Sequence, residues 1–595
     1  MTGDGDERVR FRLALRKQPE TAEPETAEAE TAQPESAEPQ TAQPNAARPL
    51  QGLLALGIYL AAWLSTQARP LIEHPSRAQL DQVSMDPNLF VWCLRWWPYA
   101  ISHGLNPLYS GEIGAPAGHV LAWVTTVAPL GLLTAPITDT AGPVVSFNLL
   151  AALSLPLSAW AAFVLCRRLT RRFWPSMVGG FIFGFSAYQM NHINAGQLDI
   201  TFSLLLPLMA YFVVLWRDAA IGSRRLAGLL AITLAAQFYL FLETFADVTA
   251  VFVIALLAGY VLAGRSARPT VARLSRLIGL AYAMALVLAA PCIWVALHHM
   301  PPKFTNVASL DLASLVVPSP GRTLGLSWLA HAAALPVPES ADGYVGIPLL
   351  LMALALAVTT WSNKLIRFLA VMLVIVIVAA LGPVAHLGGA RLFGLPWAQL
   401  WHLPILRSAF PARLMVFAFL ILAVMAATWL ARTATSAWAR WPLALLAVTV
   451  IVLDTPSLDI APRSEVPTFI SAGWYRDHLA AGETVVVISE VGNAGMLWQA
   501  ETDFYPKLAG GYISQMLTPR TDLPSAVQDL AQGTPRDIKQ FRAFASEARI
   551  GAILIQASAE PRWASVFSEL GLQGRLIGGV LVYPLNDSGV VRSAG

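Results

Sequence analysis

The sequence predicts an all-α, multi-pass membrane domain followed by a smaller α/β domain at the C-terminus. The chain has 595 residues, of which 55% are hydrophobic and only 13% charged, whereas about 25% of residues are charged in a typical soluble domain. Its mean hydropathy is +0.55, and its apolar residues are gathered into long runs. This composition excludes an ordinary soluble enzyme, a coiled coil and a disordered protein. The net charge of only +3 gives no indication of nucleic-acid binding, so no nucleic-acid partner is expected.

The first 49 residues are expected to form a disordered cytoplasmic tail. A basic stretch at 8–17 is followed at 19–44 by a degenerate repeat of Pro, Glu, Thr and Ala without a large apolar side chain. Such a segment buries too little apolar surface to offset its ordering entropy. A secretion signal would instead have an apolar core directly after the basic stretch.

The membrane domain is predicted at 50–454, with about eleven transmembrane helices. A helix needs about 20 apolar residues to cross the hydrocarbon core. The runs close to this length are 50–67, 144–166, 174–190, 200–216, 226–241, 245–263, 277–297, 344–361, 365–381, 414–430 and 438–453.

The run 119–137 could be a twelfth span, but charge and proline argue against it. Cytoplasmic loops are rich in Lys and Arg. If 119–137 does not span the membrane, every basic cluster lies on the cytoplasmic side with the basic N-terminus. These clusters follow residues 166, 216, 264, 363 and 431. Pro129 and Pro136 would also break a straight helix. We therefore expect an interfacial or re-entrant helix; the alternative is a full span that places 167–172 outside.

This topology places the loops 68–142, 298–343 and 382–413 outside the plasma membrane, together with the C-terminal domain at 455–595. In that domain we predict strands at 484–489, 550–556 and 576–583, and amphipathic helices at 523–531, 537–548 and 562–570. Strands that alternate with helices indicate an α/β layer.

Acidic residues gather on the predicted outer side of the membrane. Asp86 lies in the first outer loop, Asp199 in the turn after the third span, and Glu243 between the fifth and sixth spans. Charged side chains beside membrane spans are costly and usually functional. An ion relay would place some of them near the bilayer midplane. Their distribution therefore predicts a catalytic site at the outer surface.

Asp86 also has a structural interpretation. Pro87 suits the first turn of a helix, so Asp86 could act only as the N-cap of an interfacial helix at 88–103. Trp96 and Trp97 on that helix are candidates for substrate binding, or could anchor it at the membrane surface.

The other candidates have alternatives of the same kind. Asp199 could cap the span that follows it, and Glu243 could pair with Arg407 or Arg413. Arg413, at the entrance of a span, could bind a phosphate or only extend towards the membrane surface. Arg407 and His192 complete the candidate substrate-binding set. No HExxH, CxxC or GxSxG motif is present, so no metal ligands are assigned and a divalent metal cofactor has no motif support.

The order of these parts resembles the GT-C class of integral-membrane glycosyltransferases. The shared features are an acidic residue before an interfacial helix (Asp86 in MDPNLFVWCLRWWPYAISHGLNPLYS), an acidic later turn (Asp199), a large outer loop after the seventh span and a final α/β domain. The segment CRRLTRRFWPSMVGGFIFGFSAYQM looks like the connection between the second and third spans of that class. The segment LPWAQLWHLPILRSAFPARLMVFAFL resembles the late outer loop of its actinobacterial-type members.

The resemblance implies a GT-C-like fold, with a hexosyl or pentosyl group moved from a polyprenyl-phosphate-linked donor to a cell-envelope acceptor at the outer face of the bilayer. Asp86 would match the catalytic carboxylate of the first loop. Because Asp86, Asp199 and Glu243 come from three separate outer connections on one membrane face, we also predict that Asp199 and Glu243 line the same pocket as Asp86. The second acidic residue that usually follows in the class is absent, because Pro87 and Asn88 stand there.

Two other classes of function remain open on the sequence. One is a lipid or polysaccharide transporter or flippase, which would contain inverted repeats and broken midplane helices; no convincing internal repeat is present. The other is a non-catalytic envelope-assembly protein whose C-terminal domain binds a partner. Loss of Asp86 would abolish the activity of an enzyme and spare a scaffold.

Overall fold

The structure is a computed structural model. It describes residues 47–80, 84–299, 309–318, 340–400, 410–432, 437–454, 458, 460–462, 466–489, 493–513, 524–530, 535–559, 563, 566–567 and 570–585. The described residues from Arg48 onward belong to one compact unit. The predicted disordered tail falls almost wholly outside the described residues, as does Arg407.

Helices occupy all eleven predicted spans. They are α1 (Ala47–Trp63) with η1 (Leu64–Ala68) and α2 (Arg69–Glu73), α6 (Pro143–Thr170), α7 (Phe173–Gly184) with α8 (Ala187–Asn194), α9 (Leu198–Thr201) with α10 (Leu205–Arg217), α11 (Ser223–Leu240), α12 (Leu242–Leu262), α13 (Arg268–His298), α15 (Ile347–Thr359), α16 (Lys364–Ala380), α18 (Met415–Ala431) and α19 (Ala437–Asp454). Among the described residues, seven helical segments are long and apolar enough to cross a membrane. The prediction of a multi-pass helical membrane domain is confirmed.

The sequence predicted one interfacial or re-entrant helix at 119–137, and this prediction is wrong: the segment is divided among three short elements. It begins with β3 (His119–Val120), continues into α4 (Ala128–Leu133), and ends within α5 (Ala135–Ala141). A helix rises 1.5 Å per residue, so neither short helix can cross a 30 Å core.

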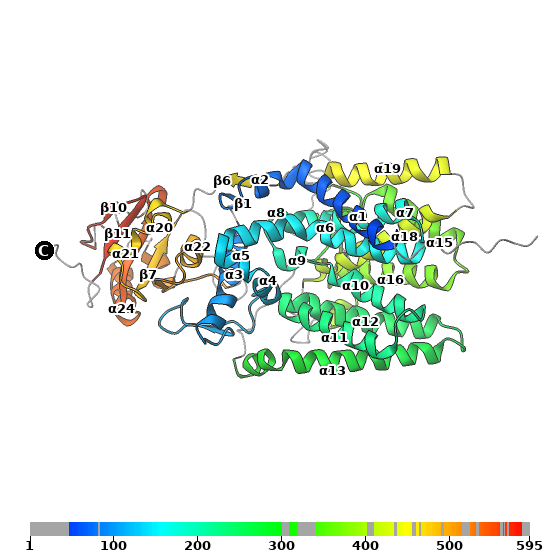
Figure 1. The fold of residues 1–595 in the computed structure, drawn as a ribbon, viewed down its shortest axis with the longest axis horizontal. Helices are drawn as coiled ribbons and strands as arrows, with labels where there is room; N and C mark the ends of the chain where they lie inside the picture. The colour runs from blue at the N-terminus through cyan, green and yellow to red at the C-terminus, as the bar shows by residue number, and fades with distance from the viewer. Residues whose placement is uncertain are drawn as a thin grey trace, which may run out of the picture. The chain divides into compact units, whose positions relative to one another are not determined.

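Basic residues and the candidate acidic residues lie at opposite ends of the helices. Arg167 and Arg168 end α6, Arg217 ends α10, and Arg268 begins α13. The turn before α9, the start of α12 and the start of α18 form the other set of ends. Consecutive helices with short connections run antiparallel, and α11, α12 and α13 pack side by side in this way (Figure 1).

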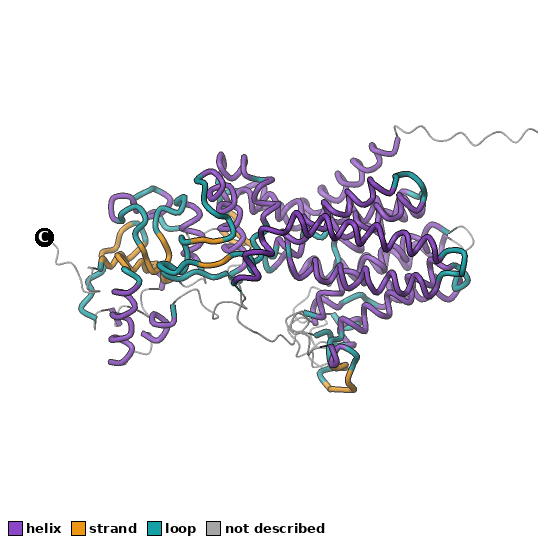
Figure 2. The backbone as a smooth tube through the Cα atoms, turned by 90° about the horizontal axis from the view of Figure 1, so that it is seen from below, coloured by secondary structure: helices purple, strands orange, loops and turns teal. Residues whose placement is uncertain are grey.

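A five-stranded mixed sheet forms the core of the C-terminal segment, and Figure 2 shows strands gathered at the left, beyond one end of the long helices. Its order is β10 (Arg575–Ile577), β11 (Val580–Pro584), β9 (Ile550–Gln556), β7 (Thr484–Ile488) and β8 (Lys507–Leu508). Strand β7 runs parallel to β8 and β9, and β11 runs antiparallel to its two neighbours.

The C-terminal segment is α/β as predicted. The helices α22 (Ala494–Glu501), α23 (Ser525–Leu530) and α24 (Pro535–Glu547) stand between its strands. Phe541 of α24 is buried with Val486, Ile553 and Ile555 of the sheet. The predicted strand 576–583 is instead a hairpin, because Gly578 and Gly579, with φ of 54° and 85°, reverse the chain inside it. The predicted helix 562–570 lies mostly outside the described residues.

Helix α3 (Asp86–Ser102) joins the C-terminal segment to the helical bundle. The indole of Trp92 donates a hydrogen bond of 2.8 Å to Oε1 of Gln499 in α22. Trp96 stacks on Trp92 with ring centroids 5.3 Å apart, and Phe504 meets both rings edge-on. This aromatic cluster fixes α3 against α22, and with it the position of Asp86 at the first turn.

Three short antiparallel pairs complete the described fold: β1 (Ala78–Leu80) with β6 (Ile460–Pro462), β2 (Tyr109–Ser110) with β3, and β4 (Val384–Leu387) with β5 (Ala390–Gly394). The first pair connects the chain just before α3 to the chain just after α19.

Candidate active site

The carboxylate of Asp86 is held from two sides. Its Oδ2 accepts a hydrogen bond of 2.7 Å from Nε2 of Gln197, and its Oδ1 accepts one of 3.1 Å from the hydroxyl of Tyr512. Asp86 is the first residue of α3, and its side chain does not cap the helix. The expected N-cap role is therefore wrong, since Met85 holds that position. Desolvation raises the pKa of Asp86, although both hydrogen bonds and the charges of Arg413 and His192 oppose this shift.

Gln197 connects Asp86 to a buried histidine. Nδ1 of His192 lies 2.5 Å from Oε1 of Gln197, and Nε2 of the same ring lies 3.3 Å from Oδ2 of Asp342. Asn191 donates a further hydrogen bond of 3.1 Å to the other oxygen of Asp342. The positive φ of Gly196, +68°, lets the turn between α8 and α9 present Gln197 towards Asp86.

Asp199 lies two residues beyond Gln197, in α9. Its side chain is buried, and its Oδ1 has no hydrogen-bond partner among the described residues. The charges of Arg413, Asp86 and His192 all act on its carboxylate. A buried carboxylate oxygen without a donor is unusual, and it is available to a group that enters the site.

Glu243 stands at the break between α11 and α12, where Phe241 adopts an extended backbone conformation. Its Oε1 accepts a hydrogen bond of 2.8 Å from the backbone N–H of Phe410, and its Oε2 forms an ion pair with Arg413. The guanidinium of Arg413 also lies 4.0 Å from the ring centre of Phe410 and 5.3 Å from that of Phe241. The ion-pair alternative for Glu243 is therefore observed, with Arg413 as its partner.

The structure thus gathers most of the candidate residues into one place, which we call the charged cluster: Asp86, His192, Asp199, Glu243, Asp342 and Arg413. Their mutual charges act on one another across five separate segments of the chain. Trp96 is not part of it, because this residue lies about 15 Å of helix rise beyond Asp86 and is packed in the aromatic cluster. Glu112, another carboxylate of the first loop, faces Lys507 at 3.8 Å instead.

A mainly apolar pocket, with about 420 Å³ of space including its open mouth, adjoins the charged cluster. Trp97, Trp123, Tyr239 and Phe241 are among the side chains that line it. Phe241 also packs on Arg413, and the lining residue Leu242 directly precedes Glu243. The cavity therefore places an apolar surface next to a partly buried arginine.

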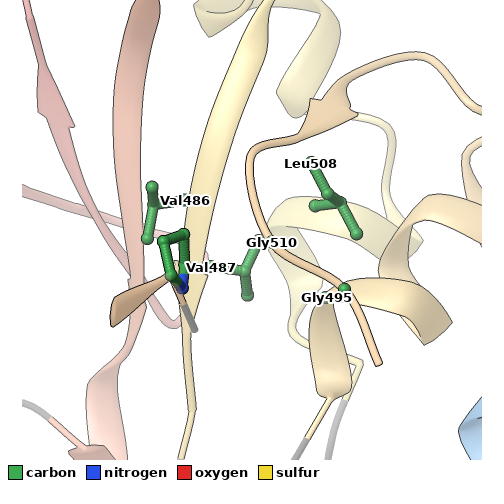
Figure 3. A pocket seen from close by; sticks show the side chains of 7 residues that line it. Val486, Val487, Gly495, Leu508 and Gly510 are labelled. Atoms are coloured by element: carbon green, nitrogen blue, oxygen red, sulfur yellow. The ribbon is translucent and has the colours of Figure 1, made fainter. Parts of the chain in front are cut away.

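A second hollow, of about 210 Å³, lies at the sheet of the C-terminal segment between β7 and β8 (Figure 3). Val486, Val487, Gly495, Leu508 and Gly510 line it. None of the described residues that line it is ionisable.

Sequence reasoning missed Gln197, Tyr512 and Asp342. Gln197 carries no charge that would mark it as a candidate. Tyr512 lies 426 positions from Asp86, and the sequence does not show that the two residues meet in space. Asp342 was readable as a carboxylate in the predicted outer loop 298–343. Among the described residues, no group of three His, Cys, Asp or Glu side chains is arranged to hold a metal ion.

No protein-family model and no curated protein matches the chain. Among solved structures, it is similar to the arabinofuranosyltransferase AftD from mycobacteria, with a TM-score of 0.56 and 15% identity. That match covers 91% of this chain but only 40% of AftD. It is also similar to the Archaeoglobus fulgidus oligosaccharyltransferase in complex with Zn and sulfate, with a TM-score of 0.52 and 12% identity over 89% of this chain and 73% of that one. The chain has the fold of GT-C membrane glycosyltransferases, as its sequence resemblance predicted.

Proposed function

We propose that this protein is a membrane glycosyltransferase that moves a sugar from a polyprenyl-phosphate-linked donor to a cell-envelope acceptor. The observation that carries the proposal is the charged cluster, in which carboxylates, a histidine and an arginine from separate segments meet beside an apolar cavity. The GT-C fold supports the same conclusion. A scaffold protein would have no need to bury so many charges together, since burying charge is costly.

The reaction assigns a role to each part of the cluster. The oxygen of an acceptor hydroxyl attacks the anomeric carbon of the sugar, and the bond between that carbon and the donor phosphate oxygen breaks. The proton of the hydroxyl passes to a carboxylate as general base, for which Asp86 is the first candidate and Asp199 the second. The departing lipid phosphate keeps the electron pair, and Arg413 is the proposed residue to stabilise its negative charge.

The cavity supports a lipid-linked donor. Its apolar lining suits the first isoprene units of a polyprenyl chain, while the adjoining Arg413 suits the phosphate. Trp97, predicted to bind substrate, lines the cavity and its buried Nε1 has no hydrogen-bond partner in the described structure. Trp97 is therefore proposed to contact the donor, whereas Trp96 supports α3.

The proposed orientation places the charged cluster and the C-terminal domain, 455–595, outside the plasma membrane. The basic residues at the opposite helix ends support this orientation through the positive-inside rule. Reporter fusions after residue 454 test it: an alkaline phosphatase fusion should be active and a fluorescent-protein fusion dark. The reverse result would overturn the orientation and the outer location of the site.

The central experiment compares the wild-type protein with Asp86→Asn in lipid nanodiscs, using radiolabelled polyprenyl-phosphate sugars and measuring transfer to envelope acceptors. The variant should fold and lose turnover by roughly 10²- to 10⁴-fold. Glu112→Gln is the matched control, because Glu112 is a partly buried carboxylate of the same loop outside the cluster. Equal loss in both variants, or full turnover of Asp86→Asn, would remove Asp86 from the mechanism. Lipid flipping without transfer by the wild type would instead identify a flippase.

A further inference from the structure

The histidine of the charged cluster is held between an acid and an amide in a geometry that fixes its charge. Gln197 donates its Nε2 to Asp86 over 2.7 Å, so the oxygen of the same amide must face His192. That oxygen is only an acceptor. Nδ1 of His192, 2.5 Å away, must therefore carry a proton.

The second ring nitrogen has the same requirement. Nε2 of His192 lies 3.3 Å from Oδ2 of Asp342, at ion-pair distance, although these two buried atoms are not aligned as a hydrogen bond. An ionised carboxylate oxygen has no proton to give to the ring. A neutral imidazole has one protonated nitrogen. It can therefore donate to only one of these two neighbours, and the lone pair of its other nitrogen would face an acceptor oxygen. Only the doubly protonated ring donates to Gln197 and also places a positive N–H beside the carboxylate of Asp342.

We propose that His192 is an imidazolium whose role is to position the catalytic carboxylate of Asp86 through Gln197. The hydrogen bonds from His192 to Gln197 and from Gln197 to Asp86 then run in one direction, and Asp342 supplies the counter-charge of the ring. When His192 loses its proton from Nδ1, the Gln197 amide is no longer held with its donor towards Asp86. His192 is thus a positioning residue, and its charge controls how much of the protein is competent for transfer.

The charges around His192 favour this state. Asp342 faces it from η3 (Ser340–Gly343), Asp86 from α3, Asp199 from α9 and Glu243 from α12, and Arg413 of η5 (Pro411–Leu414) is the facing cation. On its own helix the ring of Tyr188 lies 4.5 Å away. Burial lowers the pKa of His192, but Asp342 and the bond to Gln197 outweigh this, so that the pKa is raised above its usual value.

The inference rests on the proposed transfer reaction for its kinetic consequence only. Because the pKa of His192 is raised, the active form persists above about pH 6.5, and turnover falls as alkaline pH removes the proton. Asp342→Asn removes the stabilising negative charge with little change of shape, so it should move this alkaline limb to lower pH. His192→Gln should lower turnover by roughly 10- to 100-fold, the factor for a lost hydrogen bond to a charged group, and abolish the limb.

The charge itself can be measured without activity, by NMR of the full-length protein labelled with ¹⁵N-histidine in nanodiscs. His192→Gln assigns the signal, and His103→Gln is the matched control, since His103 is exposed at the end of α3 and stacks on Tyr99. We expect two protonated ring nitrogens for His192 at pH 7, and a shift towards the neutral ring in Asp342→Asn.

The two measurements separate the possible failures. A neutral His192 ring in the wild type at pH 7 would overturn the inference, and so would an unchanged alkaline limb in His192→Gln. A wild-type protein that transfers no sugar would overturn the proposed function, while the NMR spectrum would still decide the charge of His192. A His103→Gln variant that matched His192→Gln in its pH profile would show that the effect is not specific to this ring.

Discussion

Tyr512 donates its hydroxyl to Oδ1 of Asp86 over 3.1 Å, although the two residues are 426 positions apart in the chain. The tyrosine follows β8 in the C-terminal sheet, whereas Asp86 begins a helix of the membrane domain. The C-terminal segment therefore supplies part of the environment of the candidate base, in addition to packing on α3. In the proposed mechanism, the α/β segment would therefore take part in the chemistry.

Tyr512→Phe should lower turnover by about 10-fold while KM stays within a factor of about two, because one of the two donors to the carboxylate is lost. Steady-state transfer rates in nanodiscs would measure this. Tyr505→Phe is the matched control: its hydroxyl bonds to the backbone of Leu479 in the same segment, away from Asp86. A wild-type rate for Tyr512→Phe would mean that the hydrogen bond has no part in catalysis.

The pH dependence of transfer should have an acid limb above the usual pKa of an aspartate, about 3.9. Desolvation raises the pKa of Asp86, and only the ionised form can accept a proton, so activity is lost as the pH falls through this raised value. Tyr512 favours the charged form. Its replacement by Phe should therefore move the acid limb to still higher pH, which plots of kcat/KM against pH would show. A limb at or below the usual value would contradict the assignment of Asp86 as base.

The Glu243–Arg413 ion pair should be needed for stability as a pair. Glu243→Gln leaves a buried guanidinium without its counter-charge, which costs about 3–5 kcal/mol, and Arg413→Met leaves the carboxylate alone at a similar cost. The double variant should lose less stability than the sum of the two single variants, yet remain inactive in transfer. Unfolding in detergent, analysed as a double-mutant cycle, tests this.

Asp218→Asn provides the comparison, because its ion pair with Arg168 is more exposed, with side chains about a quarter accessible. Exposed pairs contribute about 0–1 kcal/mol. Additive losses in the Glu243 and Arg413 cycle would show that the two charges do not stabilise one another.

Gly196→Ala should impair both folding and transfer. A Cβ at this position would lie 2.5 Å from Cγ of Pro87, so the turn that presents Gln197 would be pushed away from Asp86. Gly104→Ala is a matched control, since Gly104 has a similar φ of +66° and nothing near the added atom. The two variants share the conformational cost of a positive φ, about 1–2 kcal/mol. Only Gly196→Ala should reduce turnover per folded molecule.

The helical fold could be predicted from sequence because a membrane span needs a long apolar run, and the residues of each run are contiguous in the chain. The hairpin at 575–584 was missed although the pair Gly578 and Gly579 is a turn signal between two apolar runs. The segment 119–137 was read as one helix, and its prolines instead divide it. Local sequence patterns thus predicted most elements. The errors arose where an apolar run also contained a turn-forming glycine pair or helix-breaking prolines.

The site was less predictable, for a physical reason. Asp86, Asp199 and Glu243 could be chosen because a carboxylate beside a membrane span is costly. Their convergence depends on how helices pack and on where the C-terminal segment docks, and neither is encoded locally. Gln197 and Tyr512 are uncharged, so nothing in composition separates them from other amides and phenols. The sequence allowed either Arg407 or Arg413 as the ion-pair partner of Glu243, and it could not decide between them.

The 426 residues between Asp86 and Tyr512 also have a biosynthetic meaning. At roughly 5–20 residues per second, a ribosome needs about 20–85 s to travel between these two codons. All the apolar helices have been made before Tyr512 is reached. A nascent chain that stops short of this point can enter the bilayer with its membrane helices complete, but it lacks the hydroxyl that holds Asp86. Chains truncated before this point would therefore be membrane-bound but deficient in catalysis, because the carboxylate gains this partner only after residue 512 has been made.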